Sequence, residues 1–407
     1  MTDHPLSSAQ TPWQWAIQRA TLIADILTSE DFTQLLVQGI DVIAETGQLV
    51  SDRPLQVETD SRQLTTRAVL LATGSLPRLP AIPGLETVPY ETAEAFLRRE
   101  SLPESVAIVG STPLALMLCQ ILCRGQIPVS LITPNASLLN QEDPDVSRWM
   151  TAQLRAEGAQ LRLATQVAAI TQIDSGVSLN LPDATITAET VIIAVSPAPN
   201  LTAIQLEKDW SGDRSLLVNP YLQTQHPRIY ACGSVLGSEG MPAIARQEAR
   251  LAVNNALFWN RQRIDYCALP YGLLTQPAMA RVGLTELQAK HRYQEDELLI
   301  HRQSLYENPK AQWSASTIGF CKLIAHRNGQ LLGCHGVGPE ASEWVQTISL
   351  LMGQKTPWYA ISRYPTIPHS LSDLLRQTAQ QWEHDRWQPG KWRRDWAENW
   401  FNWRRSR

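Results

Sequence analysis

One segment constrains the fold of this chain more than any other: the stretch VAIVGSTPLALMLCQIL at residues 106–122. It consists of a short apolar run, a turn that begins at Gly110, and a longer apolar run. The turn residues Ser111, Thr112 and Pro113 interrupt the hydrophobicity, so the stretch predicts a buried strand and a helix rather than a membrane span. A strand that enters a helix through a glycine turn is typical of an α/β domain.

The same alternation continues on both sides of this turn. After it we expect a strand, a helix and a further strand, at residues 129–133, 143–157 and 191–196. Before it we expect one helix and three β runs, at residues 12–27, 40–46, 50–59 and 64–74. Thr11 and Gln14 form a capping-box pattern at the start of the first helix. Asn328-Gly329 predicts a hairpin turn between two later β runs.

Composition limits the classes of function. A chain of 407 residues with 43% hydrophobic residues has room for two or three globular domains. A net charge of −4 gives no reason to expect a nucleic acid partner. Six cysteines without paired spacing favour reduced thiols and a cytoplasmic location. The first ten residues lack a secretory pattern. The histidines are scattered along the chain, so we predict no metal site.

Five short motifs occur in a specific order along the chain. They are ATGS at 72–75, the glycine turn at 110, YACGS at 230–234, VGLTE at 282–286 and YPT at 364–366. In this order they resemble the flavin-dependent pyridine nucleotide-disulfide oxidoreductases, most closely the mercuric-reductase-like branch.

The resemblance implies an α/β fold in three parts. A truncated flavin-type domain is interrupted by a Rossmann-like nucleotide-type domain, and an α+β dimerisation domain follows, so the chain is expected to be a homodimer. The implied boundaries are 1–100 and 200–262 for the flavin-type domain, 101–199 for the nucleotide-type domain, 263–380 for the dimerisation domain and 381–407 for a tail rich in Trp and Arg.

The resemblance also implies where FAD and NAD(P) bind in relatives. The matching positions here are Ala72, Thr73, Gly74, Gly233 and Ser234 for FAD, and Gly110 and Ala115 for NAD(P). Relatives carry an Asp where this chain has Ser234. We therefore treat these positions as vestigial and expect no bound cofactor.

The glycine turn itself departs from a dinucleotide motif. Its second glycine is replaced by Thr112, whose branched side chain stands where the pyrophosphate should pass. An acid expected about 20 residues later to hold the ribose is missing, since the next strand ends in Thr133-Pro134-Asn135. Either Thr112 is only a helix N-cap followed by Pro113, or the helix start still attracts NAD(P).

The catalytic positions implied by the resemblance are also changed. The family's first flavin motif and its Cys-x4-Cys pair precede the region that matches Asp31, and we expect both to be absent. The catalytic His of an H-P-T string is replaced by Tyr364, and His369 is the alternative base. We predict no catalytic residue and a binding or regulatory role; the alternatives are a residual FAD- and NAD(P)H-dependent oxidoreductase, or a reading frame that continues upstream of Met1.

Further side chains leave alternatives open. Cys119 and Cys123 share a helix face, and Cys321 and Cys334 lie diagonally across the predicted hairpin; in both cases apolar packing is favoured over redox or metal chemistry.

Six tryptophans follow Gln381: Trp382, Trp387, Trp392, Trp396, Trp400 and Trp403. The last four recur at helical spacing and would be covered by the protein's own body or dimer mate, by a partner protein, or by a membrane surface. Acidic residues in the same tail argue against nucleic acid.

Overall fold

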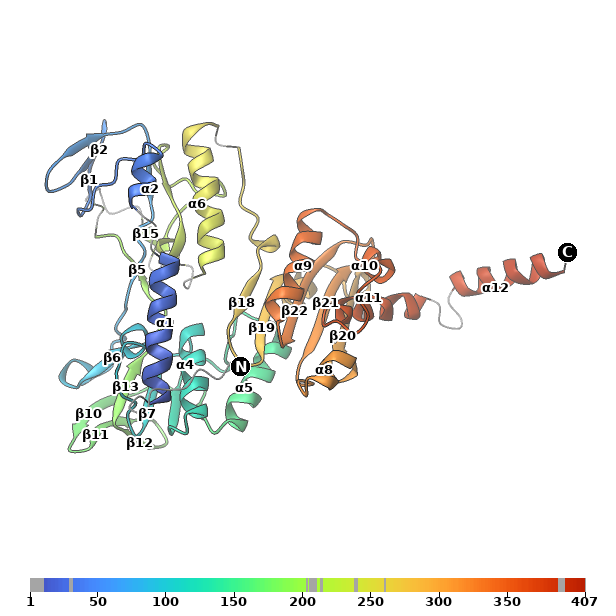
Figure 1. Cartoon of the computed structure of the whole chain (residues 1–407), viewed down its shortest axis with the longest axis horizontal. Helices are drawn as coiled ribbons and strands as arrows, with labels where there is room; N and C mark the ends of the chain where they lie inside the picture. Colours follow the sequence, from blue (N-terminus) through green and yellow to red (C-terminus); the bar gives the residue numbers. More distant parts are fainter. Residues whose placement is uncertain are drawn as a thin grey trace. The chain divides into compact units, whose positions relative to one another are not determined.

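The structure is a computed structural model that describes residues 11–28, 32–202, 204, 211–212, 215–237, 241–259, 261–386 and 392–406. The first ten residues, examined above for a secretory pattern, lie outside this set. The chain forms two compact units. The first comprises Met1–Ala136 and Leu154–Ile264, and the second comprises Ser137–Gln153 and Asp265–Arg407. Each unit is built from two separate segments of the chain (Figure 1).

A five-stranded parallel sheet organises one half of the first unit. Its order is β6 (Tyr90–Thr92), β13 (Thr190–Ile193), β7 (Val106–Val109), β8 (Val129–Ile132) and β9 (Gln160–Arg162). Every residue of β7, β8 and β13 is buried, as expected for strands covered on both faces. The predicted strand–turn–helix is confirmed, because β7 leads directly into α4 (Pro113–Arg124), which lies beside the sheet (Figure 1).

Smaller elements complete this half. An antiparallel sheet contains β10 (Ala169–Ile173), β11 (Gly176–Asn180) and β12 (Thr185–Ala188). The helix α3 (Ala93–Phe96) belongs to this half, whereas most of α5 (Pro144–Ala156) belongs to the second unit, because the unit boundary lies between Gln153 and Leu154. Apolar side chains of both sheets share one core, which includes Val109, Ile170 and Val191.

The other half of the first unit is built from short strands. They are β1 (Gln48–Asp52), β2 (Leu55–Glu58), β3 (Gln63–Thr65), β4 (Val69–Leu71), β5 (Ser75–Leu76), β14 (Ala198–Pro199), β15 (Ser211–Gly212), β16 (Ser215–Leu216) and β17 (Ile229–Ala231). β4 and β17 form a parallel pair, against which α6 (Pro242–Leu257) packs. The strand predicted at 40–46 was wrong. Its acids are engaged elsewhere, Asp41 with Arg62 at 2.7 Å and Glu45 with the backbone N–H of Ser61 at 2.8 Å.

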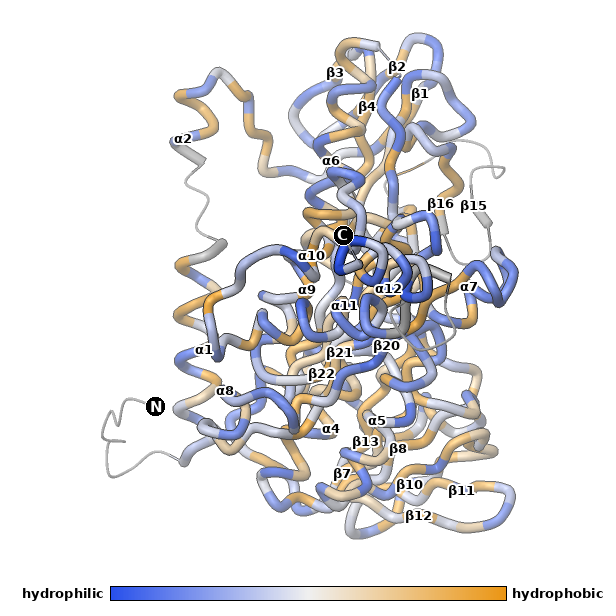
Figure 2. The backbone as a smooth tube through the Cα atoms, turned by 90° about the vertical axis from the view of Figure 1, so that its right-hand side faces the viewer, coloured by the Kyte–Doolittle hydropathy of each residue, from blue (hydrophilic) through white to orange (hydrophobic). Residues whose placement is uncertain are grey.

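Two helices precede these strands, α1 (Pro12–Thr28) and α2 (Phe32–Val37). The predicted capping box of α1 is confirmed: the Thr11 N–H donates to Gln14 Oε1, and the Gln14 N–H donates to Thr11 Oγ1. Near its start, the Trp13 indole N–H donates to the Arg99 carbonyl at 2.9 Å. Figure 2 shows apolar and polar residues alternating along α1, and Leu22 and Ile26 remain more than half exposed.

The second unit is a five-stranded antiparallel sheet with helices. The strand order is β18 (Tyr271–Leu273), β19 (Ala278–Gly283), β22 (Leu331–Gly338), β21 (Phe320–His326) and β20 (Leu298–Ser304). The helices are α7 (Glu286–Arg292), α8 (Pro309–Trp313), α9 (Ala341–Gly353), α10 (Tyr359–Arg363), α11 (Asp373–Arg386) and α12 (Trp392–Arg405). The predicted Asn328-Gly329 turn joins β21 to β22, and Leu323 faces Cys334 across it as expected. Trp344, Trp358 and Trp382 anchor the core beneath α9, α10 and α11.

Candidate nucleotide-binding site

Gly110 fixes the turn between β7 and α4. Its φ of +123° is unfavourable for any residue with a side chain. A Cβ at this position would also lie 2.1 Å from the Ala194 carbonyl oxygen. The glycine is therefore required for the close approach of two backbone segments, whether or not a ligand binds there.

Thr112 begins the helix that follows, as predicted. Its Oγ1 accepts a hydrogen bond from the Ala115 N–H at 3.3 Å, and Pro113 occupies the first helical position. Proline has no N–H, and the Ala115 N–H is already bonded. The start of α4 therefore offers fewer free amides to an anion than a glycine-rich turn would.

The neighbouring strand ends supply neutral polar groups. The hydroxyls of Ser111 and Thr133 lie 3.0 Å apart, and the Asn135 amide donates to Ser111 Oγ at 3.2 Å. In a dinucleotide site, the end of this second strand normally carries the acid that binds the ribose. Here the hydroxyl and amide groups bond to one another at that place.

The flavin-type positions are brought together by the pairing of β4 with β17. Gly74 follows β4 and Gly233 follows β17, at φ values of +76° and +80°. A Cβ on Gly74 would lie 3.9 Å from Ser234 Oγ, so the two loops are neighbours. The residues selected from the sequence therefore form two separate groups, this one and the turn at Gly110.

Both flavin-type loops are held by internal hydrogen bonds. Asn200 clamps the first: its N–H donates to the Gly74 carbonyl at 2.9 Å, and its carbonyl accepts from Thr73 Oγ1 at 2.6 Å. Ala72, between β4 and Thr73, is exposed. In the second loop the Gly233 N–H donates to Glu248 Oε2 at 2.7 Å, and Glu248 is only 1% exposed.

Cys232, which directly precedes Gly233, has a raised thiol pKa. Burial, helped by the Glu248 carboxylate, raises the pKa of the Cys232 thiol to about 11. The thiol is therefore protonated at neutral pH and is a poor nucleophile.

These contacts allow a test of whether dinucleotides fit. A pyrophosphate needs free backbone N–H groups at the glycine turns. The Ala115 N–H is bonded to Thr112 and the Gly233 N–H to a carboxylate. The described residues do not fit a dinucleotide held through these two amides.

The positions near the C-terminus show no assembled base. Tyr364 ends α10 and is 70% exposed. Thr366 is bonded to Asp373 and Arg376 instead. The ring of His369, the alternative base, packs against Trp313 with centroids 5.2 Å apart.

The cysteines form no disulfide. A hydrogen bond from the Cys119 thiol to Cys123, together with burial, raises the pKa of Cys119, and the same bond lowers that of Cys123. Cys321 and Cys334 are fully buried. Within the part of the chain that the structure describes, no three His, Cys, Asp or Glu side chains are placed to hold a metal ion.

A buried lysine in the second unit was missed at the level of sequence. Lys322 on β21 has a side chain only 3% exposed, and its Nζ lies 2.9 Å from both Asp143 Oδ1 and Asp145 Oδ2. It also pairs with Glu286 at the start of α7. Burial alone would lower the pKa of Lys322, but its bonds to the three carboxylates outweigh burial and raise it. The feature of the sequence that could have indicated this buried cation is a lysine inside the apolar run GFCKLIA.

Polar groups near this lysine are buried, as Glu142 and His335 are, or half-buried, as Arg281 is. Arg281 pairs with Glu142 at 2.5 Å, and His335 is fully buried with its Nε2 2.9 Å from the Leu284 carbonyl. Burial lowers the pKa of His335, so the ring is neutral at neutral pH. The cluster is a structural ion-pair network within the second unit.

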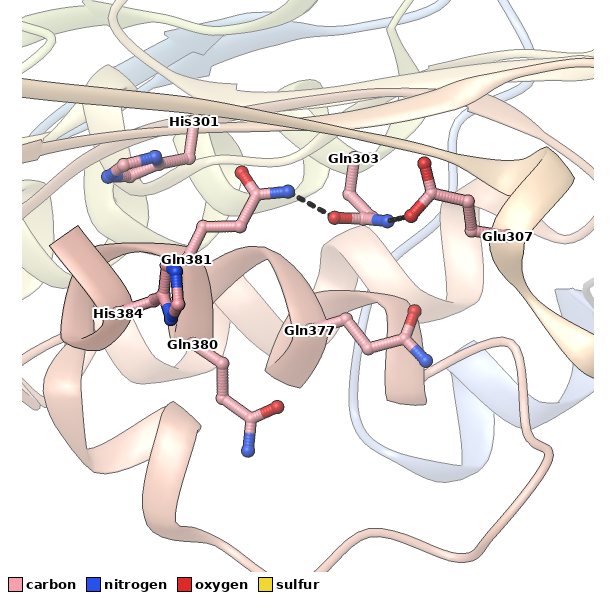
Figure 3. A pocket seen from close by; sticks show the side chains of 7 residues that line it. All are labelled: His301, Gln303, Glu307, Gln377, Gln380, Gln381 and His384. Atoms are coloured by element: carbon pink, nitrogen blue, oxygen red, sulfur yellow. Dashed lines mark hydrogen bonds between the residues drawn. The ribbon is translucent and has the colours of Figure 1, made fainter. Parts of the chain in front are cut away.

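A polar cavity of about 470 Å³ lies between β20 and α11. Figure 3 shows its lining: His301, Gln303, Glu307, Gln377, Gln380, Gln381 and His384. The Gln381 amide donates to Gln303, whose amide donates to Glu307 at 2.6 Å. The lining side chains therefore bond in part to one another, and none of the residues selected from the sequence contributes to the cavity.

Known proteins match along most of the chain. Residues 9–256 match the model of the pyridine nucleotide-disulphide oxidoreductases, and residues 269–369 match the dimerisation domain of the same proteins. Mercuric reductase of Staphylococcus aureus is 29% identical over 333 residues, 80% of this chain and 60% of the relative. Mercuric reductase of Streptomyces lividans is 30% identical over 376 residues, 88% of this chain and 78% of the relative.

Two solved structures share the fold. The Cu(II) complex of the HOCl-induced flavoprotein disulfide reductase RclA of Escherichia coli has a TM-score of 0.81 at 21% identity, over 91% of this chain and 86% of the other. LpdA of Mycobacterium tuberculosis has a TM-score of 0.82 at 21% identity, over 93% and 84%. The chain spans 60% and 51% of the length of the mercuric reductases of S. aureus and Acidithiobacillus ferrooxidans. Among the residues described, every helix is too short or too polar to cross a bilayer.

Proposed function

This chain belongs to the pyridine nucleotide-disulphide oxidoreductase family, and from that premise we propose that it is a binding or regulatory protein without disulfide or mercuric reductase activity. The family and the α/β fold predicted from the sequence are confirmed. The loss of chemistry, the homodimer, the domain boundaries, the cytoplasmic location and the vestigial cofactor positions are parts of the proposal.

One observation carries the proposal: the hydroxyl of Thr112 bonds the Ala115 amide at the start of α4. Because of this bond, the Ala115 N–H is not free to donate to an NAD(P) phosphate, as a backbone amide at this place can in a dinucleotide site. The neutral Ser111–Thr133–Asn135 group, in place of a ribose-binding acid, supports the same reading.

The chemistry of electron transfer to a disulfide or Hg(II) lacks support as well. Tyr364 stands at the position of the catalytic His. A phenol does not take the place of imidazole as a general base at neutral pH.

A homodimer is supported by the retained dimerisation domain. Its described surface exposes large apolar side chains, among them Trp313 at 74%, Tyr364 at 70% and Ile367 at 79%. Apolar groups of this size on one domain favour burial against a second copy.

A second candidate is a residual FAD- and NAD(P)H-dependent oxidoreductase without disulfide chemistry. It is favoured by the left-handed glycines Gly74 and Gly233, which end adjacent parallel strands. Such a placement suits close approach of backbone to a ligand.

Purification after expression in flavin-supplemented cells separates the two candidates. We expect no visible flavin band and no oxidation of NADH or NADPH with a disulfide or Hg(II). S. aureus mercuric reductase, assayed in parallel, serves as the positive control for reduction of Hg(II). Tyr364→His should remain inactive, because a base alone restores no dithiol. Stoichiometric flavin with NAD(P)H oxidation would overturn the proposal in favour of the second candidate.

The tail has a separate role in the proposal. We propose that α12 is a docking surface for another molecule, because its described aromatic side chains are exposed. Trp387 lies outside the described residues, and the side chain of Trp392 is not described.

A further inference from the structure

Three tryptophans form a continuous aromatic face on α12. Trp396, Trp400 and Trp403 are 62%, 48% and 46% exposed. The rings of Trp396 and Trp400 stack 5.9 Å apart at an interplanar angle of 9°, and those of Trp400 and Trp403 lie 5.0 Å apart. Phe401, 62% exposed, extends the apolar surface beyond Trp400. All four aromatic side chains are therefore at least 46% exposed.

The helix that presents this face has its own stabilising features. Asp395 lies in its first turn, and Arg404 and Arg405 lie in its last turn, each sign suited to the helix dipole. Arg394 also bonds Glu398 one turn later at 2.7 Å. A helix of 14 residues is nevertheless marginal on its own helix propensity, so a docking surface would stabilise it.

The charge of α12 points to an anionic occupant. Four arginines against two acids give the helix a net charge of +2, whereas the whole chain carries −4. Arginine pairs occur near both ends of the helix. A second copy of α12 would therefore oppose arginines to arginines in either a parallel or an antiparallel pairing, which disfavours self-association through this face.

Indole and guanidinium groups together match a lipid interface. Tryptophan has an apolar body and an N–H donor, and it is favoured at the level of lipid headgroups. Arginine at the same level binds phosphates and is attracted by anionic lipid. An amphipathic helix of this kind lies in the plane of the surface.

We propose that α12 binds the surface of an anionic lipid bilayer, with Trp396, Trp400 and Trp403 in the headgroup layer and Arg404 and Arg405 against lipid phosphates. The inference rests on the proposed role of α12 as a docking surface and names its partner. It is independent of whether the protein binds flavin.

Vesicle flotation with the full-length chain tests the inference. We expect binding to vesicles of equal phosphatidylcholine and phosphatidylglycerol, and at least about tenfold weaker binding to phosphatidylcholine alone. The variant Trp396→Ala/Trp400→Ala/Trp403→Ala should lose binding to both. Arg404→Gln/Arg405→Gln should weaken binding to anionic vesicles by about fivefold per arginine and leave the neutral vesicles unaffected.

The matched control removes exposed aromatic side chains of the first unit. Phe258 and Trp259 are 76% and 73% exposed, so Phe258→Ala/Trp259→Ala changes surface aromatics without touching α12 or the dimerisation domain, and it should bind like the unaltered protein. Equal binding to neutral and anionic vesicles, or unchanged binding of the triple variant, would overturn the inference. Loss of a dimer in the triple variant, measured by light scattering, would identify a second copy as the occupant instead. A yellow, active protein that still floats would refute the proposed function and leave this inference standing.

Discussion

The Thr112 hydroxyl lies 3.3 Å from the amide nitrogen of Ala115 and accepts its hydrogen. The bond joins the N-cap of α4 to the third residue of the helix, the usual geometry of a threonine cap. The place where a dinucleotide turn has its second glycine is thus used to stabilise the fold.

Replacing Thr112 by Ala should lower the free energy of unfolding by about 1 kcal/mol, because the Ala115 amide loses its partner. NADH binding, measured by fluorescence titration, should remain as weak as in the unaltered protein. Thr92, which caps α3 by the same contact with Ala95, provides the control. Thr92→Ala should cost a similar amount. A Thr112→Ala variant of full stability would show that the cap contributes nothing.

Gly110→Ala should be more damaging. The new Cβ would lie 2.1 Å from the Ala194 carbonyl oxygen, and φ is +123°, so we expect a loss of roughly 2–4 kcal/mol in urea unfolding. Gly158→Ala separates the two causes. Gly158 has φ +98° but no atom within 4 Å of an added Cβ, so this change should cost only about 1 kcal/mol. Equal losses in both variants would exclude the steric contact with Ala194 as the main cause.

Lys322→Met should destabilise the second unit by about 3–5 kcal/mol, because it leaves Asp143, Asp145 and Glu286 without their shared cation. Thermal and urea unfolding would measure the loss. Lys290→Met is the control, since Lys290 also pairs with Glu286 but is 42% exposed. It should change stability little. A stable Lys322→Met protein would mean that the carboxylates tolerate burial without a cation.

The same cluster predicts that acid changes the stability of the unaltered protein and that of the Lys322→Met variant in opposite directions. Burial raises the pKa of Asp145 and Glu286, but bonds to lysine and arginine outweigh it and bring both below their ordinary values of 3.8 and 4.5. In the unaltered protein this stabilisation is present above those ordinary values and is lost as the pH falls below them. Without Lys322, burial raises the carboxyl pKa values, so the deficit of Lys322→Met should shrink as the pH falls from 7 to about 4. A pH-independent deficit, seen in urea titrations across this range, would contradict the electrostatic cause.

The proposed homodimer predicts a mass twice the 45.5 kDa of one chain by light scattering at micromolar concentration. Ile367→Asp, at a side chain 79% exposed, should yield monomers with an unchanged circular dichroism spectrum. Leu217→Asp, at an exposed apolar residue of the first unit, should leave the dimer intact. A monomeric unaltered protein would refute the proposal.

Periodic and capped segments could be predicted from the sequence. The strand–turn–helix around Gly110, the capping box at Thr11 and the hairpin at Asn328 depend on contacts within a few residues, and each was confirmed. The strand at 40–46 failed because its pattern is local but its acids bond to Ser61 and Arg62 some twenty residues away.

The features of the candidate site divide in the same way, into those set by local sequence and those set by tertiary contacts. Thr112 as an N-cap followed from spacing alone, whereas the clamp of Asn200 on Thr73 and the bond from Gly233 to Glu248 depend on tertiary packing. Lys322 was missed for that reason. Its two Asp partners lie 179 and 177 residues earlier in the chain, beyond the reach of any local sequence pattern.

That separation has a consequence for the order of folding during synthesis. Ser137–Gln153 leaves the ribosome long before the β-sheet to which it contributes three carboxylates, and it must wait for more than a hundred residues of the other unit. A fragment that began at Asp265 would hold Lys322 with Glu286 alone, so the second unit is complete only when both distant pieces of the chain are present.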